Sequence, residues 1–126
     1  MPHLTIDYSA NLEEAVDIAA LCDTLRRAGI ASGVFPLAGV RVRAFAATHV
    51  SIADGNPKHG YIDISVRLRG GRTMEAKQAA TRAVFDAAER FLAPVMATRS
   101  LALSFEMRDI DPDLSPKTGS IRDHLD

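Results

Sequence analysis

The residue whose position could make it a reactive base is Pro2, the proline that follows the first methionine. Pro2 opens residues 2–8, in which apolar and polar side chains alternate as in a half-buried β-strand. If Met1 is removed, Pro2 becomes a secondary amine on that strand. An α-amino group titrates near pH ~8 in water, and burial or a nearby cation lowers this pKa, leaving a neutral general base. The alternative is that Met-Pro is only an easily processed start.

Three arginines could complement such an amine. Arg41 and Arg43 project from the same face of a predicted strand, and Arg72 lies where a later strand turns into a helix. A planar guanidinium at the rim of a sheet can hold a carboxylate in a two-pronged grip. Solvated surface charge is the alternative for each of them.

Other catalytic or binding motifs are missing from the sequence. None of the four histidines shares a metal-ligand spacing with another, so no metal site is predicted. There is no phosphate-binding glycine loop, nucleophile elbow or dinucleotide fingerprint. Gly70 and Gly71 precede a predicted helix and could cradle an anion, but two glycines are more typical of a tight turn.

Length and composition set the class of protein. The chain has 126 residues with 47% hydrophobic and 25% charged residues, which fits one globular domain over residues 1–126. A net charge of −1 gives no electrostatic footprint for nucleic acid or an anionic membrane. The single cysteine excludes an intrachain disulfide, and no apolar run is long enough to span a membrane. We therefore expect a soluble cytoplasmic protein.

The residues that could do chemistry must be positioned by four strands and two helices. Alternation predicts strands over residues 2–8, 40–45, 62–69 and 101–108. A capping box at Asn11 predicts the start of the first helix, and Gly29 predicts its end. Thr73 is expected to cap the second helix, which Pro94 is expected to end.

The order β-α-β, connection, β-α-β predicts an α+β fold built from two pseudo-repeats, residues 2–47 and 61–109. Each repeat is a right-handed crossover with parallel strands, and together they form a four-stranded sheet with both helices on one face. The opposite face carries apolar residues such as Phe45, so we expect oligomerisation to cover it. Residues 110–126 form a tail that wraps a neighbouring surface, adds a short strand or stays loose.

Several stretches together resemble the tautomerase superfamily, and within it the 5-carboxymethyl-2-hydroxymuconate isomerase family. They are Met-Pro-His at residues 1–3, Gly-Val-Phe-Pro-Leu-Ala-Gly-Val-Arg at 33–41, Ile-Ala-Asp-Gly at 52–55, Gly-Arg-Thr-Met-Glu at 71–75 and Leu-Ala-Leu-Ser-Phe-Glu at 101–106. The second half also resembles the short subunit of 4-oxalocrotonate tautomerase, with its Gly-Arg corner and its Ala93-Pro94 pair. One departure is Arg69, which stands where the family pattern has glycine and bears on substrate preference.

The resemblance implies a homotrimer that uses the amino-terminal proline as proton carrier, without a metal or an organic cofactor. Carried over by position, Pro2 is the catalytic base and then acid. Arg41 and Arg72 are catalytic and carboxylate-binding. Arg43, on the same strand face as Arg41, is predicted from its position to be a further substrate-binding residue.

The implied activity is isomerisation of 5-carboxymethyl-2-hydroxymuconate, a small anionic dienol of homoprotocatechuate breakdown, to its conjugated 2-oxo isomer. A proton must move from oxygen to a distant carbon, which one neutral base can do. Two alternatives remain. The chain could act as tautomerase or hydratase on another 2-hydroxydienoate or a phenylpyruvate-like enol, or it could be a non-catalytic oligomeric binding module.

Overall fold

The computed structural model describes all 126 residues as one mixed sheet covered by two helices. The strands are β1 (His3–Ser9), β2 (Arg41–Ala47), β3 (Gly60–Arg69) and β4 (Leu101–Ile110), and the helices are α1 (Ile18–Ala31) and α2 (Met74–Met96). Three short 3₁₀ turns follow β1, follow β4 and close the chain: Ala10–Leu12, Pro112–Leu114 and Ile121–His124. Neither long helix contains a stretch apolar enough to cross a membrane.

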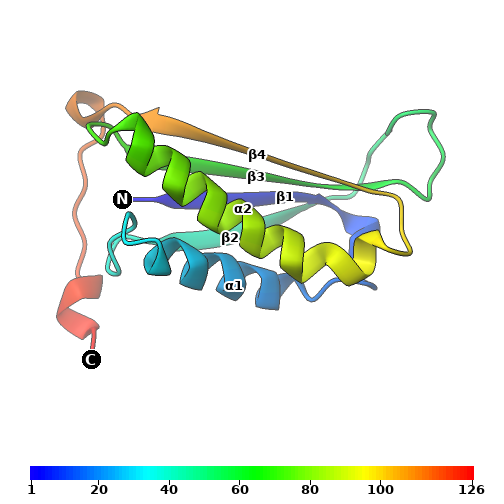
Figure 1. Cartoon of the computed structure of the whole chain (residues 1–126), viewed down its shortest axis with the longest axis horizontal. Coiled ribbons are helices and arrows are strands. Elements are labelled where there is room, and N and C mark those ends of the chain that lie inside the picture. Colours follow the sequence, from blue (N-terminus) through cyan, green and yellow to red (C-terminus); the bar gives the residue numbers. More distant parts are fainter.

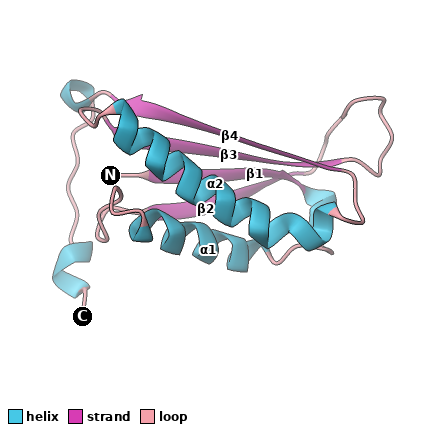
Figure 2. Cartoon of the chain, viewed as in Figure 1, coloured by secondary structure: helices cyan, strands magenta, loops and turns pink.

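The sheet has the strand order β2-β1-β3-β4, and both helices lie on the same face of it (Figures 1 and 2). β1 pairs with β2 in parallel and β3 pairs with β4 in parallel, whereas the central pair β1 and β3 is antiparallel. The two parallel pairs confirm the predicted crossover units. The antiparallel centre makes the start of β1 a neighbour of the end of β3, which determines where the candidate site lies.

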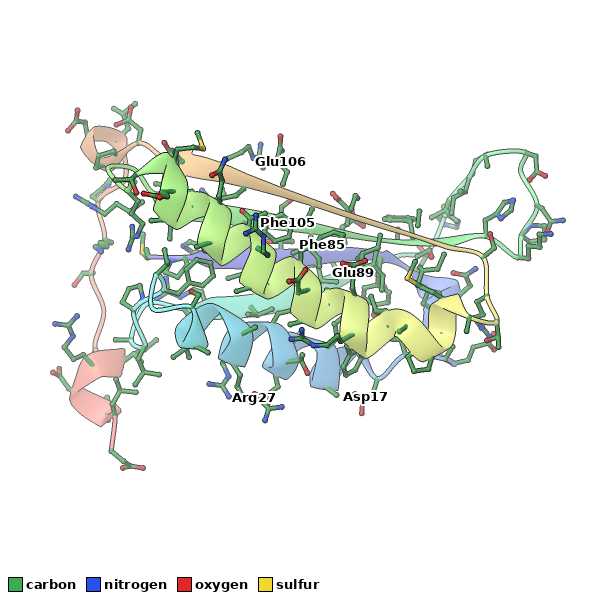
Figure 3. The ribbon with its side chains drawn as sticks, in the orientation of Figure 1. Asp17, Arg27, Phe85, Glu89, Phe105 and Glu106 are labelled. Atoms are coloured by element: carbon green, nitrogen blue, oxygen red, sulfur yellow. The ribbon has the colours of Figure 1, made fainter.

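The core lies between the sheet and the helices. Alternate residues of β1 and β3 point into it, and the buried side chains from these two strands are Leu4, Ile6, Tyr8, Ile62, Ile64, Val66 and Leu68. Burying one such aliphatic side chain contributes about 1.5–3 kcal/mol, so a one-residue register slip would forfeit most of the core. At the sheet edge, Phe85 of α2 meets Phe105 of β4 edge to face, with ring centroids 6.3 Å apart (Figure 3).

The predicted start of the first helix is wrong. α1 begins at Ile18, and its cap is Asp17, whose carboxylate accepts a hydrogen bond from the backbone N–H of Ala20 at 3.0 Å. Asn11 instead donates to the carbonyl of His59 at 2.9 Å, and Glu14 pairs with Arg99 at 2.6 Å. The local capping pattern is overridden because these polar side chains have partners far along the chain.

The predicted end of the first helix is also wrong, since α1 runs through Gly29 to Ala31. Gly29 is buried beneath the ring of Phe35, and a β-carbon at this position would stand 2.3 Å from Phe35 Cδ2. The glycine is therefore needed for close packing within the helix. It lets the aromatic ring seal the turn that leads to β2.

The second helix begins as predicted but extends further. The Thr73 hydroxyl accepts a hydrogen bond from the N–H of Ala76 at 3.1 Å, which confirms the cap. Pro94 lies inside α2, and the N–H of Ala97 still bonds to the carbonyl of Ala93 at 3.1 Å. A proline in the last turn removes one helical hydrogen bond, and the exposure of Arg90 and Pro94 lets water solvate the freed carbonyl.

The sheet face opposite the helices is mostly polar but carries one large apolar side chain, Phe45, which is 58% exposed. Tyr61 donates to Asp7 at 2.6 Å on this face, and the bond raises the pKa of the Tyr61 phenol to about 12. The Tyr61–Asp7 hydrogen bond thus holds these side chains in place, and no part of the chain covers Phe45.

Two ends of the sheet are named below. The amino end comprises the starts of β1 and β2, the ends of β3 and β4, and the start of α2. The loop end comprises the opposite strand termini and residues 48–59, which project away from the sheet (Figure 1).

Candidate active site

Pro2 lies immediately before β1 at the amino end and is fully buried. Its carbonyl accepts a hydrogen bond from the N–H of Arg41 at 3.2 Å, so the backbone ties it to the first residue of β2. A proline before the strand costs no ladder hydrogen bond, because its missing N–H lies outside the ladder. Met1 is half-buried, and its α-amino group marks where the chain reaches the surface.

The turn before β2 brings Gly39 and Arg41 against Pro2. The carbonyl of Pro36 accepts hydrogen bonds from the N–H groups of Gly39 and Val40 at 3.0 and 3.1 Å, which closes the turn. A β-carbon on Gly39 would lie 3.4 Å from Cδ of Pro2, in van der Waals contact. The first side chain beyond this turn is that of Arg41, which is half-buried.

Arg72 reaches the same end from the corner between β3 and α2. Gly71 has a φ of 109°, a conformation that favours glycine, so the chain can reverse within two residues. This confirms the tight turn expected at Gly70-Gly71. The guanidinium of Arg72 donates to the carbonyl of Arg69 at 3.1 Å, and the positive end of the α2 dipole follows directly.

Arg43 is exposed and takes a different position from Arg41. Its guanidinium lies 3.2 Å from Nδ1 of His3. The pKa of His3 is lowered by burial and then by the charges of Arg41, Arg67 and Arg43, so His3 stays neutral at pH 7 and accepts this hydrogen bond. Arg43 therefore stands beside the strand that carries Pro2, outside the cavity described next.

A cavity of about 410 Å³ opens at the amino end. One side is formed by Met1, Pro36, Ala38, Gly39 and Arg41. The other side is the tail, residues 117–123, which contributes Lys117 and Arg122 together with the carboxylate of Asp123. The tail forms no strand. It leaves β4, makes two 3₁₀ turns and runs past the end of the sheet (Figure 1).

The electrostatics of this end disfavour a charged amine. The pKa of the Met1 α-amino group is lowered by burial first, and then by the charges of Lys117, Arg72, Arg41 and Arg69. None of these four cations has a carboxylate within ion-pair distance. The cations nearest this amine are not paired with a carboxylate, and their charges favour a neutral nitrogen and an anionic ligand.

The structure thus places Pro2, Arg41 and Arg72 at one end of the sheet and Arg43 beside them. Sequence reasoning missed Lys117, because the tail has no periodic pattern that predicts where its side chains lie. Its only signal is that it is one of two cations, with Arg122, in a segment with few apolar anchors. No group of three or more acidic, histidine or cysteine side chains gathers anywhere that could hold a metal ion.

Comparison with known proteins shows the family to which the chain belongs. The chain matches the family described as 5-carboxymethyl-2-hydroxymuconate isomerase over residues 2–125. It is 31% identical over 121 residues to a 5-carboxymethyl-2-hydroxymuconate Delta-isomerase of Escherichia coli, covering 96% of both chains. It also superposes on a crystal structure of a 5-carboxymethyl-2-hydroxymuconate delta-isomerase with a TM-score of 0.92 and 30% identity, over 98% of this chain and 92% of the other.

A more distant structural neighbour is described as a fused 4-OT wild type symmetric trimer. It superposes with a TM-score of 0.62 and 26% identity, over 86% of this chain and 85% of the other. The shared fold, the family match and the near-complete coverage all agree. The chain therefore belongs to the 5-carboxymethyl-2-hydroxymuconate isomerase family of the tautomerase superfamily.

Proposed function

We propose that this protein is an isomerase that converts 5-carboxymethyl-2-hydroxymuconate to its conjugated 2-oxo isomer, with Pro2 as the proton carrier. The relative from Escherichia coli is named for this reaction. The observation that carries the proposal is the amino terminus itself, half-buried among cations that have no carboxylate partner. Such surroundings suit a neutral base and an anionic substrate.

The proposed mechanism needs one base. With Met1 removed, the nitrogen of Pro2 takes the proton of the 2-hydroxyl group, and the electrons of the O–H bond delocalise into a dienolate. The protonated nitrogen then delivers the same proton to the distant carbon of the dienolate, which leaves a conjugated ketone. Proton and charge balance without any co-reactant, and the nitrogen returns to its neutral state.

The lowered pKa of the α-amino group supports this role. At pH 7 a group that titrates below its usual value of 8.0 is more often neutral. The main cause is burial, and the cations at the amino end act in the same direction. Removal of Met1 moves the amine by one residue toward the turn at Gly39, so the same side chains remain its neighbours.

The arginines would bind and stabilise the anion. We propose that Arg41 and Arg72 hold carboxylate and enolate oxygens, while Arg43, held by its contact with His3, extends the binding surface. A donor that meets charge developing in the transition state contributes about 3–4 kcal/mol, which corresponds to 10²–10³ in kcat. Charge developing on the dienolate oxygen is the feature these donors would recognise.

The decisive test combines intact mass with an ultraviolet assay. Mass spectrometry of the purified protein should show loss of Met1, and the muconate dienol should be converted with the absorbance change of a conjugated ketone. Pro2→Ala should lose about 10²–10⁴-fold in turnover while the protein keeps its fold. Retained Met1 together with full activity would reject Pro2 as the base. Turnover of a phenylpyruvate enol alone would assign another substrate.

We also propose that the chain assembles as a homotrimer through the sheet face that carries Phe45. A relative of this fold is described as a symmetric trimer, and the face is uncovered within one chain. Light scattering should give three times the chain mass. Phe45→Asp should lower that mass, because it adds a charge to the buried contact. A variant that remains trimeric would show that the interface lies on another face.

A further inference from the structure

The tail brings two cations to the amino-end cavity, Lys117 and Arg122, which lie outside both repeats of the fold. Residues 115–120 run from the β4 side of the molecule past the end of the sheet to the turn that precedes β2 (Figure 1). The Ser115 hydroxyl donates to the carbonyl of Asp111 at 2.5 Å, which fixes the point where the tail departs. The segment from Lys117 to Asp123 then faces Arg41 across the cavity.

Within this wall, Lys117 is the charge that acts on the amino terminus. It is the first of the charged groups that lower the pKa of the Met1 α-amino group, ahead of Arg72, Arg41 and Arg69. Arg122 and Asp123 line the same cavity but do not contribute to that shift. The Lys117 ammonium also lacks a carboxylate within ion-pair distance, so it is free to take one from a ligand.

The proposed substrate has a negatively charged group that the Lys117 ammonium could bind. A carboxymethyl-substituted muconate carries three carboxylates, two on the muconate chain and one on the substituent. Arg41 borders the cavity from the sheet, and Arg72 reaches the same end from the start of α2. Arg43 lies outside the cavity beside His3, which leaves the third carboxylate to a cation of the tail. An ammonium on a flexible four-carbon stem can reach a substituent whose position differs from that of the main chain.

We propose that Lys117 binds the third carboxylate of the substrate, so that the C-terminal tail determines the preference for a tricarboxylate over a dicarboxylate. This inference rests on the proposed function of the site. It assigns Lys117 a role in specificity, and the proton transfer itself remains with Pro2.

The test compares two dienols, 5-carboxymethyl-2-hydroxymuconate and 2-hydroxymuconate, which lacks the substituent. For Lys117→Gln we expect KM for the tricarboxylate to rise about tenfold, the cost of one charge-assisted contact, with kcat within about twofold. The kinetic constants for the dicarboxylate should not change. Lys58→Gln is the matched control, because Lys58 is an exposed, unpaired lysine at the loop end.

Equal losses on both dienols, or none on either, would overturn the assignment. Calorimetric titration with two unreactive anions, propane-1,2,3-tricarboxylate and glutarate, separates this failure from failure of the proposed function. We expect the wild-type protein to bind the tricarboxylate more tightly, and Lys117→Gln to abolish that preference. If no muconate is converted, the isomerase proposal fails, but the titration still tests whether Lys117 gives the preference for a tricarboxylate. A preference that survives in Lys117→Gln would reject the inference.

Discussion

The two ends of the sheet carry cavities of nearly the same size, but Arg41, Lys117, Arg122 and Asp123 line the amino-end cavity, whereas no Lys, Arg, Asp or Glu lines the loop-end cavity. The amino-end cavity measures about 410 Å³ and the loop-end cavity about 400 Å³. At the loop end, His59 lies 2.7 Å from Asp54 and 2.6 Å from Ser100, and Arg99 pairs with Glu14. At the amino end Lys77 pairs with Asp109 at 3.3 Å, but Lys117, Arg72, Arg41 and Arg69 have no carboxylate within ion-pair distance. Volume alone would not tell these two cavities apart.

The difference shows what marks a site in a small fold. Hydrogen-bonded side chains such as His59 hold residues 48–59 in place, and their polar groups are already satisfied. Cations that gather without counter-ions repel one another and cost stability, so their gathering is explained by what they bind. Because the sequence has a net charge of only −1, this local imbalance does not show in its composition.

Among the changes that test this comparison of the two ends, removing one arginine from the amino end should give the largest effect. We expect Arg41→Ala and Arg72→Ala each to lower kcat/KM about 10²–10³-fold, since each removes a donor that meets developing negative charge. Steady-state kinetics with the muconate dienol measures this. Arg82→Ala is the control, because Arg82 is exposed on α2 and unpaired. An unchanged kcat/KM in both variants would show that the unpaired cations at the amino end do not mark the active site.

At the loop end, a change should affect stability and leave catalysis intact. His59→Gln removes the link between Asp54 and Ser100, and we expect a melting temperature lower by a few degrees with kcat/KM within about twofold. Differential scanning calorimetry and the ultraviolet assay test the two halves of this statement. Loss of activity at an unchanged melting temperature would show that the loop end also does chemistry.

A smaller effect is expected for the ion pair that joins the turn between α2 and β4 to the segment after β1. Arg99 and Glu14 approach to 2.6 Å, but their side chains are 33% and 72% exposed, so solvent screens the pair. Arg99→Ala should therefore lower the free energy of unfolding by less than about 1 kcal/mol and leave turnover unchanged. Urea denaturation measures this. A loss of unfolding free energy several times larger would mean that other contacts at the loop end depend on this ion pair.

The smallest expected effect is a shift in the pH profile. The α-amino pKa is lowered, so protonation should inactivate the free enzyme only below its usual value of 8.0. The acidic limb of kcat/KM then lies below pH ~8. Salt screens the cations and lets the amine protonate more easily, so the midpoint should move up by a few tenths of a pH unit. Profiles at low and high ionic strength test this, with His59→Gln moving in parallel with wild type. A midpoint that falls with salt would contradict the assignment.

The regular elements could be predicted because their causes are local. Alternation placed the strands, and the hydroxyl of Thr73 capped α2 as expected. The errors at Asn11, Gly29 and Pro94 have another origin. Each depends on a residue distant in the sequence or on exposure to solvent. The three causes are the carbonyl of His59, the ring of Phe35 and the exposed last turn of α2.

The candidate site divides in the same way. The sequence by itself determined the residue types, since Pro2, Arg41, Arg43 and Arg72 were identified by their places relative to strands and a helix. Only the tertiary structure decided that Arg41 borders the cavity while Arg43 turns to His3, and that Lys117 joins them. The physical reason is that alternation and caps act over a few neighbouring residues, whereas the tail lies where packing and distant contacts leave it, and no local pattern encodes that.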